Sequence, residues 1–397
     1  MLLGDMGASV LKIEEPTRGD DTRSWLPPSA PVKPHSPAPH LPPESAYFLS
    51  SNRNKRSLGL NFKHPHGQSI IHNLVKDADV LVENFLPNKL KIFNLDYDTI
   101  KSINPGIIYA SITGYGQTGP YANAPGYDVL IEAEAGLMHI TGERDGSPVK
   151  VGVAITDITT GLYAHGAILA ALFHKQRTGE GVHLDINLFD TQLASLANIA
   201  SNYLVTGQEA TRQGTSHPSI VPYQTFPTLD GQIMIGAGSD VQFESLSGIL
   251  GKREWLEGEW TSNAGRVRHR TALVGELDTI ISSHSTQHWL DTFSEAKARF
   301  SFGPINNIAQ SFEHPQSLAR GVVTEVDHPR IGALKLTAPA VGYGGKRLEV
   351  HRPPPFLAQH TTEILREEGY TEQQILELRA EGVVVDNSNS LCRKSKL

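Results

Sequence analysis

Between residues 47 and 113 the chain alternates apolar runs with amphipathic segments, and this alternation constrains the fold more than any other feature. Strands are predicted at 9–14, 57–61, 80–85, 107–112 and 182–188, and helices at 66–78 and 95–103. Strands that alternate with helices are typical of parallel βαβ units. We therefore predict an α/β fold whose larger domain is a doubly wound, Rossmann-like sheet. In such sheets ligands bind beyond the carboxyl ends of the strands.

The pattern changes near residue 216, where the expected strands become short and tryptophans fall in helical segments. We predict a large domain over residues 1–200 and a smaller α+β domain over 216–309. Residues 321–397 then return to the large domain and include the C-terminal tail. A proline-rich stretch at 27–43 should form an exposed loop, because its prolines forbid a helix or a central strand.

Composition excludes several classes of partner. The formal net charge of −7 leaves no basic footprint for nucleic acid, and no apolar run is long enough to span a membrane. The single cysteine, Cys392, allows neither a disulfide nor a cysteine-based metal site. The 17 histidines are scattered without metal-ligand spacing, so we predict no metal. A small molecule or coenzyme is therefore the expected ligand.

The segment from Val151 to Asp190 places an acid, Asp157, between two ordered elements. A helix rich in Gly and Ala is predicted over 161–173, and its small residues indicate close packing against another element. With Thr159 or Thr160 as the N-cap, Asp157 lies just before the helix, where the helix dipole favours an ionised carboxylate. That position suits a nucleophile or a general base. Spacing alone, however, favours a simple capping or turn aspartate.

Seven short motifs occur in an order that is specific as a set, although each alone is weak. They are Gly4-Asp5-Met6-Gly7-Ala8, Lys12-Ile13-Glu14, Gly19-Asp20 with Arg23, Asn54-Lys55-Arg56-Ser57, Val82-Glu83-Asn84-Phe85, Gly114-Tyr115-Gly116 and Thr156-Asp157 with Gly161. With them the chain resembles the class III CoA-transferases, from Leu2 to about Val385. The segments most similar to family members that move CoA between dicarboxylates are 136–142, 219–226, 303–307 and 352–355.

The resemblance implies a covalent mechanism at Asp157. In the family the aspartate attacks an acyl thioester to give a mixed anhydride and CoA thiolate, and the thiolate then forms an aspartyl thioester that a second acid resolves. Acyl-CoA and a dicarboxylic acid are the implied substrates, with no permanently bound cofactor. The residues that match the family's substrate segment and its mobile glycine-rich loop are Tyr127, Asp128, Gly236, Ala237 and Gly238. The resemblance implies that this loop closes over the site.

The resemblance also implies a CoA site. The positions that match the family's CoA contacts are Arg23, Leu60, Lys63, Asn84 and Phe85. Cations suit the phosphates, while an apolar side chain and an aromatic ring suit the adenine or the pantetheine. Where the family often has a basic residue this chain has Ile92, and Lys89 or Lys91 is expected to replace it. Taken alone, Arg23 and Lys63 would be interpreted as surface charges.

Two further expectations come from the family. Its members are pairs of interlocked rings, so the chain should form a homodimer with a large buried interface. They also carry a strand and a helix N-terminus ahead of the point that matches residue 1, and that strand is central in their sheet. We therefore expect the start of this sequence to be incomplete.

Two other functions are compatible with the sequence. α-Methylacyl-CoA racemases are similar around Asp157, but they have a histidine where this chain has Tyr127, and a tyrosine is a poor base at neutral pH. The second is a CoA-binding protein without activity, because an absent strand would leave unpaired backbone groups in the sheet. Acyl-CoA exchange assays on a length-restored protein separate both from the transferase.

The sequence ends in Ser395-Lys396-Leu397, a tripeptide that the peroxisomal import receptor recognises. We predict peroxisomal localisation, with a mitochondrial address as the alternative. A fluorescent fusion with a free C-terminus should enter peroxisomes. Deletion of Leu397 should leave the fusion in the cytosol, because the receptor recognises the intact tripeptide. The same cytosolic or mitochondrial signal with and without Leu397 would contradict this prediction.

Overall fold

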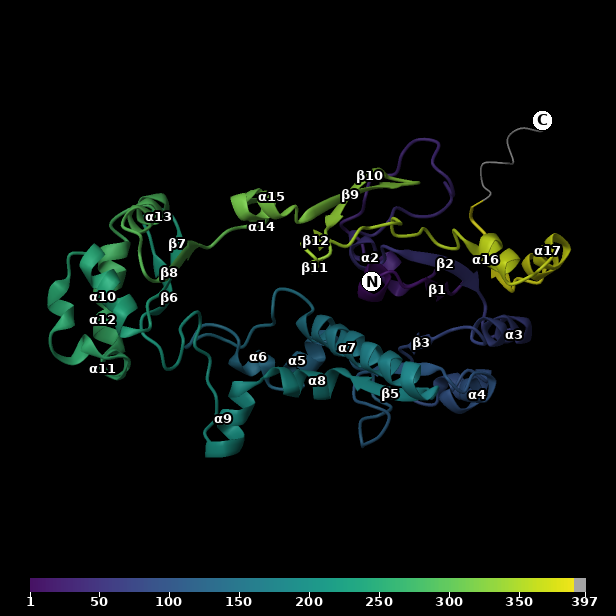
Figure 1. Cartoon of the computed structure of the whole chain (residues 1–397), viewed down its shortest axis with the longest axis horizontal. Coiled ribbons are helices and arrows are strands. Elements are labelled where there is room, and N and C mark those ends of the chain that lie inside the picture. The colour runs from purple at the N-terminus through teal and green to yellow at the C-terminus, as the bar shows by residue number, and fades with distance from the viewer. Residues whose placement is uncertain (389–397) are drawn as a thin grey trace. The chain divides into compact units, whose positions relative to one another are not determined.

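The computed structural model describes residues 1–388 and divides the chain into two compact units (Figure 1). Unit 1 comprises residues 1–131, residues 156–192 and the described residues from 312 onwards, and unit 2 comprises residues 132–155 and 193–311. Cys392 and the Ser395-Lys396-Leu397 tripeptide, which was predicted to be an import signal, lie outside the described residues.

This division differs from the predicted domains, because residues 132–155 and 193–200 belong to unit 2 and not to the large domain. The chain leaves unit 1 after Ile131, inside one helix, and returns at Thr156, inside another. Since no loop or change of composition marks these crossings, the sequence pattern did not reveal them.

Unit 1 contains the parallel strands that the sequence predicted. Strands β3 (Val80–Glu83), β4 (Ile108–Thr113) and β5 (Val182–Asn187) form one parallel sheet in that order. A second sheet has the order β1-β2-β13, with the bounds Val10–Glu14, Lys55–Leu60 and Val384–Val385. The mixed α/β class is confirmed. Among residues 1–388, however, these strands form two three-stranded sheets and not the single doubly wound sheet that was predicted.

Helices and two short hairpins complete unit 1. The helices are α1 (Leu2–Asp5), η1 (Asp21–Ser24), α2 (Ala46–Ser51), α3 (Pro65–Leu74), η2 (Lys89–Phe93), α4 (Tyr97–Ile103), α7 (Ile155–Thr178), α15 (Pro315–Arg320), α16 (Thr361–Glu367) and α17 (Glu372–Ala380). Three more helices cross between the units: α5 (Asp128–Glu134), α8 (Leu188–Ser195) and α14 (Ile308–Glu313). The hairpins are β9 (Val323–His328) with β10 (Gly332–Thr337), and β11 (Gly342–Tyr343) with β12 (Lys346–Arg347). Within residues 1–388, no helix is long and apolar enough to cross a membrane.

The β3–β5 sheet is covered on both faces, as parallel sheets usually are. Successive side chains of β4 point to opposite faces. Tyr109 packs into a core built from β2, α3, α4, α16 and α17. Ala110 packs on the other face against Ala164 and Ile168 of α7. Because α7 leads into β5 through a short turn, its first turn lies at the carboxyl-end edge of this sheet.

Unit 2 is a smaller α+β unit with an antiparallel sheet in the order β6-β7-β8. Its elements are α6 (Leu137–Ile140), α9 (Asn198–Thr206), β6 (Tyr223–Pro227), β7 (Gln232–Gly236), α10 (Asp240–Ile249), η3 (Arg253–Leu256), η4 (Gly258–Thr261), α11 (Asn263–Arg268), α12 (Arg270–Ile281), α13 (Thr286–Glu295) and β8 (Ser301–Pro304). Buried aromatic side chains, among them Phe226, Phe243 and Trp255, form a core between the sheet and its helices.

Candidate active site

Asp157 lies in the first turn of α7, which begins before the threonines predicted to cap it. The N–H of Asp157 is one of the free amides at the helix N-terminus, and it donates to Oδ1 of Asp128 over 3.0 Å. A side chain from α5 therefore caps α7. The expected position of Asp157 before the helix was wrong, because a cap supplied by another element cannot be seen in local spacing. Thr160 instead donates its hydroxyl to the carbonyl of Thr156 inside the helix.

Two glycines bring Asp128 to this position. Gly114 follows β4 and Gly126 lies two residues before α5. Their backbones are so close that a Cβ on Gly126 would lie 2.5 Å from the Cα of Gly114. A side chain at either glycine would force the two segments apart. Because α5 starts directly after this contact, the end of β4 holds the Asp128 carboxylate at the N-terminus of α7.

The surroundings of Asp157 make its carboxylate more basic. Asp157 is exposed at the surface of unit 1, yet the protein atoms around its carboxyl group, and secondly the Asp128 carboxylate, raise its pKa above the usual value. Tyr47 on α2 is close enough that, after burial, the charges of Asp157 and Asp128 raise the pKa of its phenol. Tyr47 therefore stays protonated and can donate a hydrogen bond near Asp157. Its ring packs edge-on against Trp25, with centroids 4.7 Å apart.

An accessible carboxylate with a raised pKa suits nucleophilic attack on an acyl carbon. The carboxylate supplies the electron pair, and a donor can stabilise the oxyanion that forms. Tyr127, which the sequence placed in the substrate segment, is 69% exposed and directly precedes Asp128.

Two of the predicted CoA contacts come together at the carboxyl ends of β2 and β3. Lys63 lies exposed beyond β2, and Phe85 lies beyond β3 with 37% of its surface exposed. The ring of Phe62 links the two segments, because its centroid lies 5.7 Å from that of Phe85 and 5.4 Å from that of Phe93. Aromatic surfaces beside a lysine can hold an adenine ring and a phosphate.

The remaining contacts divide into accessible and buried residues. Asn84 and Lys89 are exposed, on the turn between β3 and η2 and at the start of η2. Ile92 is 67% exposed and contributes no charge there. Leu60 has no exposed surface and packs in the core of unit 1. Its predicted contact with CoA was wrong for the side chain, because the alternation along β2 turns Leu60 into the core.

Arg23 is also buried, with 7% of its surface exposed. Its Nε and Nη2 donate to the two carboxylate oxygens of Glu14 over 2.7 and 2.8 Å. Nη2 also donates to the Pro355 carbonyl, Nη1 donates to Glu44, and the guanidinium lies 3.7 Å from the ring centroid of Phe48. Four of the five N–H donors of Arg23 are therefore occupied. The predicted phosphate contact is corrected: Arg23 is an internal ion-pair residue.

The glycine-rich segment lies in unit 2 and is an ordered turn. Gly236 ends β7, and Ala237 is fully buried, with its N–H donating to the carbonyl of Pro222 over 2.9 Å. The carbonyl of Gly238 accepts a hydrogen bond from Arg266 over 2.9 Å. These bonds anchor the turn at the start of α10, and the expected mobility of this loop stays a prediction. Its closure over Asp157 stays a prediction.

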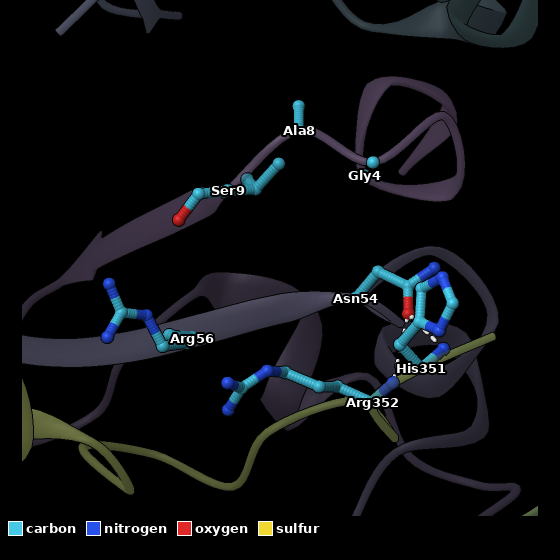
Figure 2. Close-up of a pocket in the computed structure, with 9 residues that line it drawn as sticks. Gly4, Ala8, Ser9, Asn54, Arg56, His351 and Arg352 are labelled. Atoms are coloured by element: carbon cyan, nitrogen blue, oxygen red, sulfur yellow. Dashed lines mark hydrogen bonds between the residues drawn. The ribbon is translucent and has the colours of Figure 1, made fainter.

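A cavity of about 400 Å³ in unit 1 contains none of the predicted site residues (Figure 2). It is lined by residues of the segment 4–10 and by Asn54, Arg56, His351 and Arg352. Asn54 Oδ1 accepts the N–H groups of His351 and Arg352 over 2.8 and 3.0 Å. Because the cavity adjoins the first residues of β1 and β2, it lies at the opposite strand ends from the predicted CoA contacts. Within residues 1–388, no group of three or more His, Cys, Asp or Glu side chains is placed to hold a metal ion.

The sequence did not single out Tyr47 or Phe62. Phe62 could have been found, because it lies beyond the carboxyl end of a predicted strand and beside Lys63. Tyr47 lies far from Asp157 in the sequence, and no local pattern connects the two. The tertiary fold of unit 1 brings them together.

The sequence profile of CoA-transferase family III matches residues 1–361. The chain belongs to CoA-transferase family III. It is 46% identical over 386 residues to succinyl-CoA:glutarate CoA-transferase from Homo sapiens, and the match covers 97% of this chain and 85% of that protein. It is 41% identical over 371 residues to succinate–glutarate CoA-transferase from Agrobacterium fabrum, and the match covers 92% of this chain and 90% of that protein. The crystal structure of a CaiB/BaiF family protein from Brucella suis matches this structure with a TM-score of 0.80 and 39% identity, covering 92% of this chain and 93% of that one.

As a family III CoA-transferase, the chain is an enzyme that takes CoA thioesters as substrates. The roles of Lys63 and Phe85 in holding CoA, and of Asp157 in carrying the acyl group, stay predictions.

Substitution Arg23→Gln separates a structural role from a CoA contact. It should lower the free energy of unfolding at neutral pH by about 3–5 kcal/mol, because Glu14 would stay buried without its cationic partner, whereas Glu44 keeps Arg330. It should change the KM for an acyl-CoA less than twofold. Urea unfolding and steady-state kinetics measure the two effects, with Lys63→Gln as the control that should raise KM without loss of stability.

The effect should depend on pH. Burial alone would raise the pKa of Glu14, but the hydrogen bonds and charge of Arg23 outweigh it and hold this pKa below its usual value. The stabilisation is therefore present above the pKa of the unfolded state and is lost as pH falls through the lower pKa of the folded state. The stability difference between wild type and Arg23→Gln should shrink in acid. A raised KM with unchanged stability would restore Arg23 to the CoA site.

Proposed function

We propose that this enzyme moves CoA from a dicarboxylyl-CoA such as succinyl-CoA to a second dicarboxylic acid such as glutarate or hydroxymethylglutarate. The observation that carries the proposal is the accessible Asp157 carboxylate at the capped start of α7. The dicarboxylate specificity is inferred from the 46% identity to a relative named for succinyl-CoA and glutarate.

The reaction begins when the Asp157 carboxylate attacks the thioester carbonyl of the donor. The C–S bond breaks, CoA leaves as the thiolate, and the acyl group stays on Asp157 as a mixed anhydride. The thiolate then attacks the Asp157 carbonyl of that anhydride. The donor acid leaves as its carboxylate, and an aspartyl-CoA thioester remains on the enzyme.

The acceptor repeats these steps in the opposite direction. Its carboxylate attacks the aspartyl thioester, CoA leaves as the thiolate, and a new mixed anhydride forms. The thiolate attacks the acceptor carbonyl, which releases the new acyl-CoA and restores the Asp157 carboxylate. Each step exchanges one acyl donor for another of similar energy, so no external energy source is required.

The neighbours of Asp157 support these steps. Burial around the carboxyl group, and secondly the charge of Asp128, raise the pKa of Asp157, which makes the ionised carboxylate a better nucleophile. The Tyr47 hydroxyl, which stays protonated, can donate to an oxyanion near Asp157. An α-methylacyl-CoA racemase is less well supported, because Tyr127 stands where the racemases have a histidine.

Substitution Asp157→Asn should lower CoA exchange between succinyl-CoA and glutarate by several orders of magnitude, because the amide keeps the size but lacks the anionic nucleophile. Acyl-CoA binding should survive. Asp157→Glu should also fail, because one methylene moves the carboxylate by about an ångström from its attack geometry. Hydroxylamine trapping with peptide mass analysis should label Asp157 when acyl-CoA is present. Wild-type exchange by Asp157→Asn, or a label on Asp128 or Glu83, would disprove the mechanism.

A matched variant separates the charge of Asp128 from its hydrogen bond. Asp128→Asn keeps an oxygen that can accept the Asp157 N–H but removes the neighbouring charge. Exchange should fall as pH decreases through the raised pKa of Asp157, because the carboxylate becomes protonated. In Asp128→Asn this acid limb should move to lower pH. An unchanged limb would show that the Asp128 charge does not act on the nucleophile.

We also propose that the enzyme is a homodimer in which a second copy covers helix α7. The small residues of this helix were expected to pack closely against another element. Within the described residues, a Cβ added to Gly161 or Gly166 would meet no atom within 4 Å. Ile158, Leu162 and Phe173 are 50%, 53% and 61% exposed, and they follow one face of the helix with Gly166. An exposed apolar face of this kind marks an interaction site.

The dimer is tested with two exposed leucines. Leu162→Arg places a charge on the α7 face and should convert the dimer to a monomer in light scattering. Leu376→Arg changes a leucine that is 57% exposed on α17 and should leave the dimer intact. An active wild-type monomer, or a dimer that is unaffected by Leu162→Arg, would contradict this arrangement.

A further inference from the structure

Glu83 is the last residue of β3, and its carboxylate closes the turn that carries two predicted CoA contacts. Its Oε2 accepts the backbone N–H of Phe85 over 2.8 Å. This bond spans Asn84 and fixes the backbone on both sides of it. It therefore sets the directions in which the Asn84 amide and the Phe85 ring leave the strand.

Ser111 on the neighbouring strand β4 contacts Glu83, and His183 on β5 contacts Ser111. Ser111 is 1% exposed and is paired with Glu83 in the register of β3 and β4. Its hydroxyl interacts with the carboxylate, and its Oγ lies 2.9 Å from Nε2 of His183 on β5. The ring of His183 stacks on Tyr97, with centroids 4.8 Å apart. The turn is thus connected through three strands to helix α4.

A partly buried carboxylate is a costly group with which to close a turn. Burial raises the pKa of Glu83, and the Ser111 hydroxyl, the Phe85 N–H and His183 offset this only in part. A serine or an asparagine could accept the same N–H without a buried charge. The carboxylate, Ser111 and His183 also line a cavity of about 220 Å³ beside this turn. The carboxylate is therefore both bonded to the turn and placed beside a cavity.

We propose that Glu83 is a positioning residue of the CoA site, which holds the Phe85 N–H and so presents Asn84 and Phe85 to the CoA moiety. This rests on the proposed function, in which Asn84 and Phe85 contact CoA. The effect extends to Lys63, because the Phe85 ring packs against Phe62 with centroids 5.7 Å apart. Glu83 acts through these residues and does not touch the reacting acyl group. Its loss should therefore raise KM for acyl-CoA and leave kcat unchanged.

The test compares Glu83→Ala with Glu83→Gln in the full-length enzyme, with succinyl-CoA and glutarate as substrates. Glu83→Ala should raise KM for succinyl-CoA about tenfold with kcat within about twofold, because a hydrogen bond to a charged group is lost. Glu83→Gln keeps an oxygen for the Phe85 N–H and should restore most of the affinity. Asp230→Ala, which removes a carboxylate that accepts the Thr286 N–H over 2.7 Å in unit 2, is the matched control and should change neither constant.

Hydrogen exchange gives a second measurement without substrate. In Glu83→Ala, peptides that contain Phe85 should exchange faster, while peptides from β4 and the unfolding midpoint stay as in wild type. If Glu83→Ala does not fold, Ser111→Ala replaces it and should raise KM about threefold in the same way.

The outcomes separate this inference from the proposed function. If Asn84→Ala and Phe85→Ala raise KM but Glu83→Ala and Ser111→Ala do not, the positioning role is overturned and the CoA site stands. If Asn84→Ala and Phe85→Ala leave KM unchanged, the CoA site itself is wrong and the inference fails with it. A fall in kcat at constant KM in Glu83→Gln would also overturn the positioning role.

Discussion

The hydrogen bond from the Asp157 N–H to Asp128 is the interaction on which the site depends. It supplies a cap to α7, so the helix begins at Ile155 and Asp157 stands in its first turn. The same Asp128 carboxylate contributes to the raised pKa of Asp157. One residue therefore sets the place of the proposed nucleophile and adds to the rise in its pKa, which burial causes first. The contact itself requires the close approach of Gly114 and Gly126, where a side chain would not fit.

Charged side chains in unit 1 divide into those that hold the fold and those that are free to meet a ligand. Arg23 and Glu14 are buried and paired, and their desolvation is balanced by their mutual hydrogen bonds. Lys63 and Lys89 are exposed and stay available for phosphate groups. In a sequence, a buried and paired cation cannot be told apart from an exposed one. Only burial and hydrogen-bond partners distinguish them.

Helix α7 connects the chemistry with the proposed assembly. One face, with Ala164 and Ile168, packs on the β3–β5 sheet and fixes the direction of the helix. The first turn carries Asp157. The exposed face, with Ile158 and Leu162, is the face that we propose a second copy covers. One helix therefore carries the packing face, the proposed nucleophile and the proposed dimer face.

The sequence by itself determined the mixed α/β class and the parallel strands near residues 80–85 and 107–112, and its motifs led to the predictions for Asp157 and the Asn84–Phe85 turn. These features depend on local alternation of apolar residues and on short motifs, and both are formed by residues that are close together in the sequence. The cap from Asp128, the nearby Tyr47, the burial of Arg23 and Leu60, and the crossings between the units at Ile131 and Thr156 were decided only by the tertiary structure. Each of them depends on contacts between segments that are distant in the sequence, so the local sequence pattern cannot predict them.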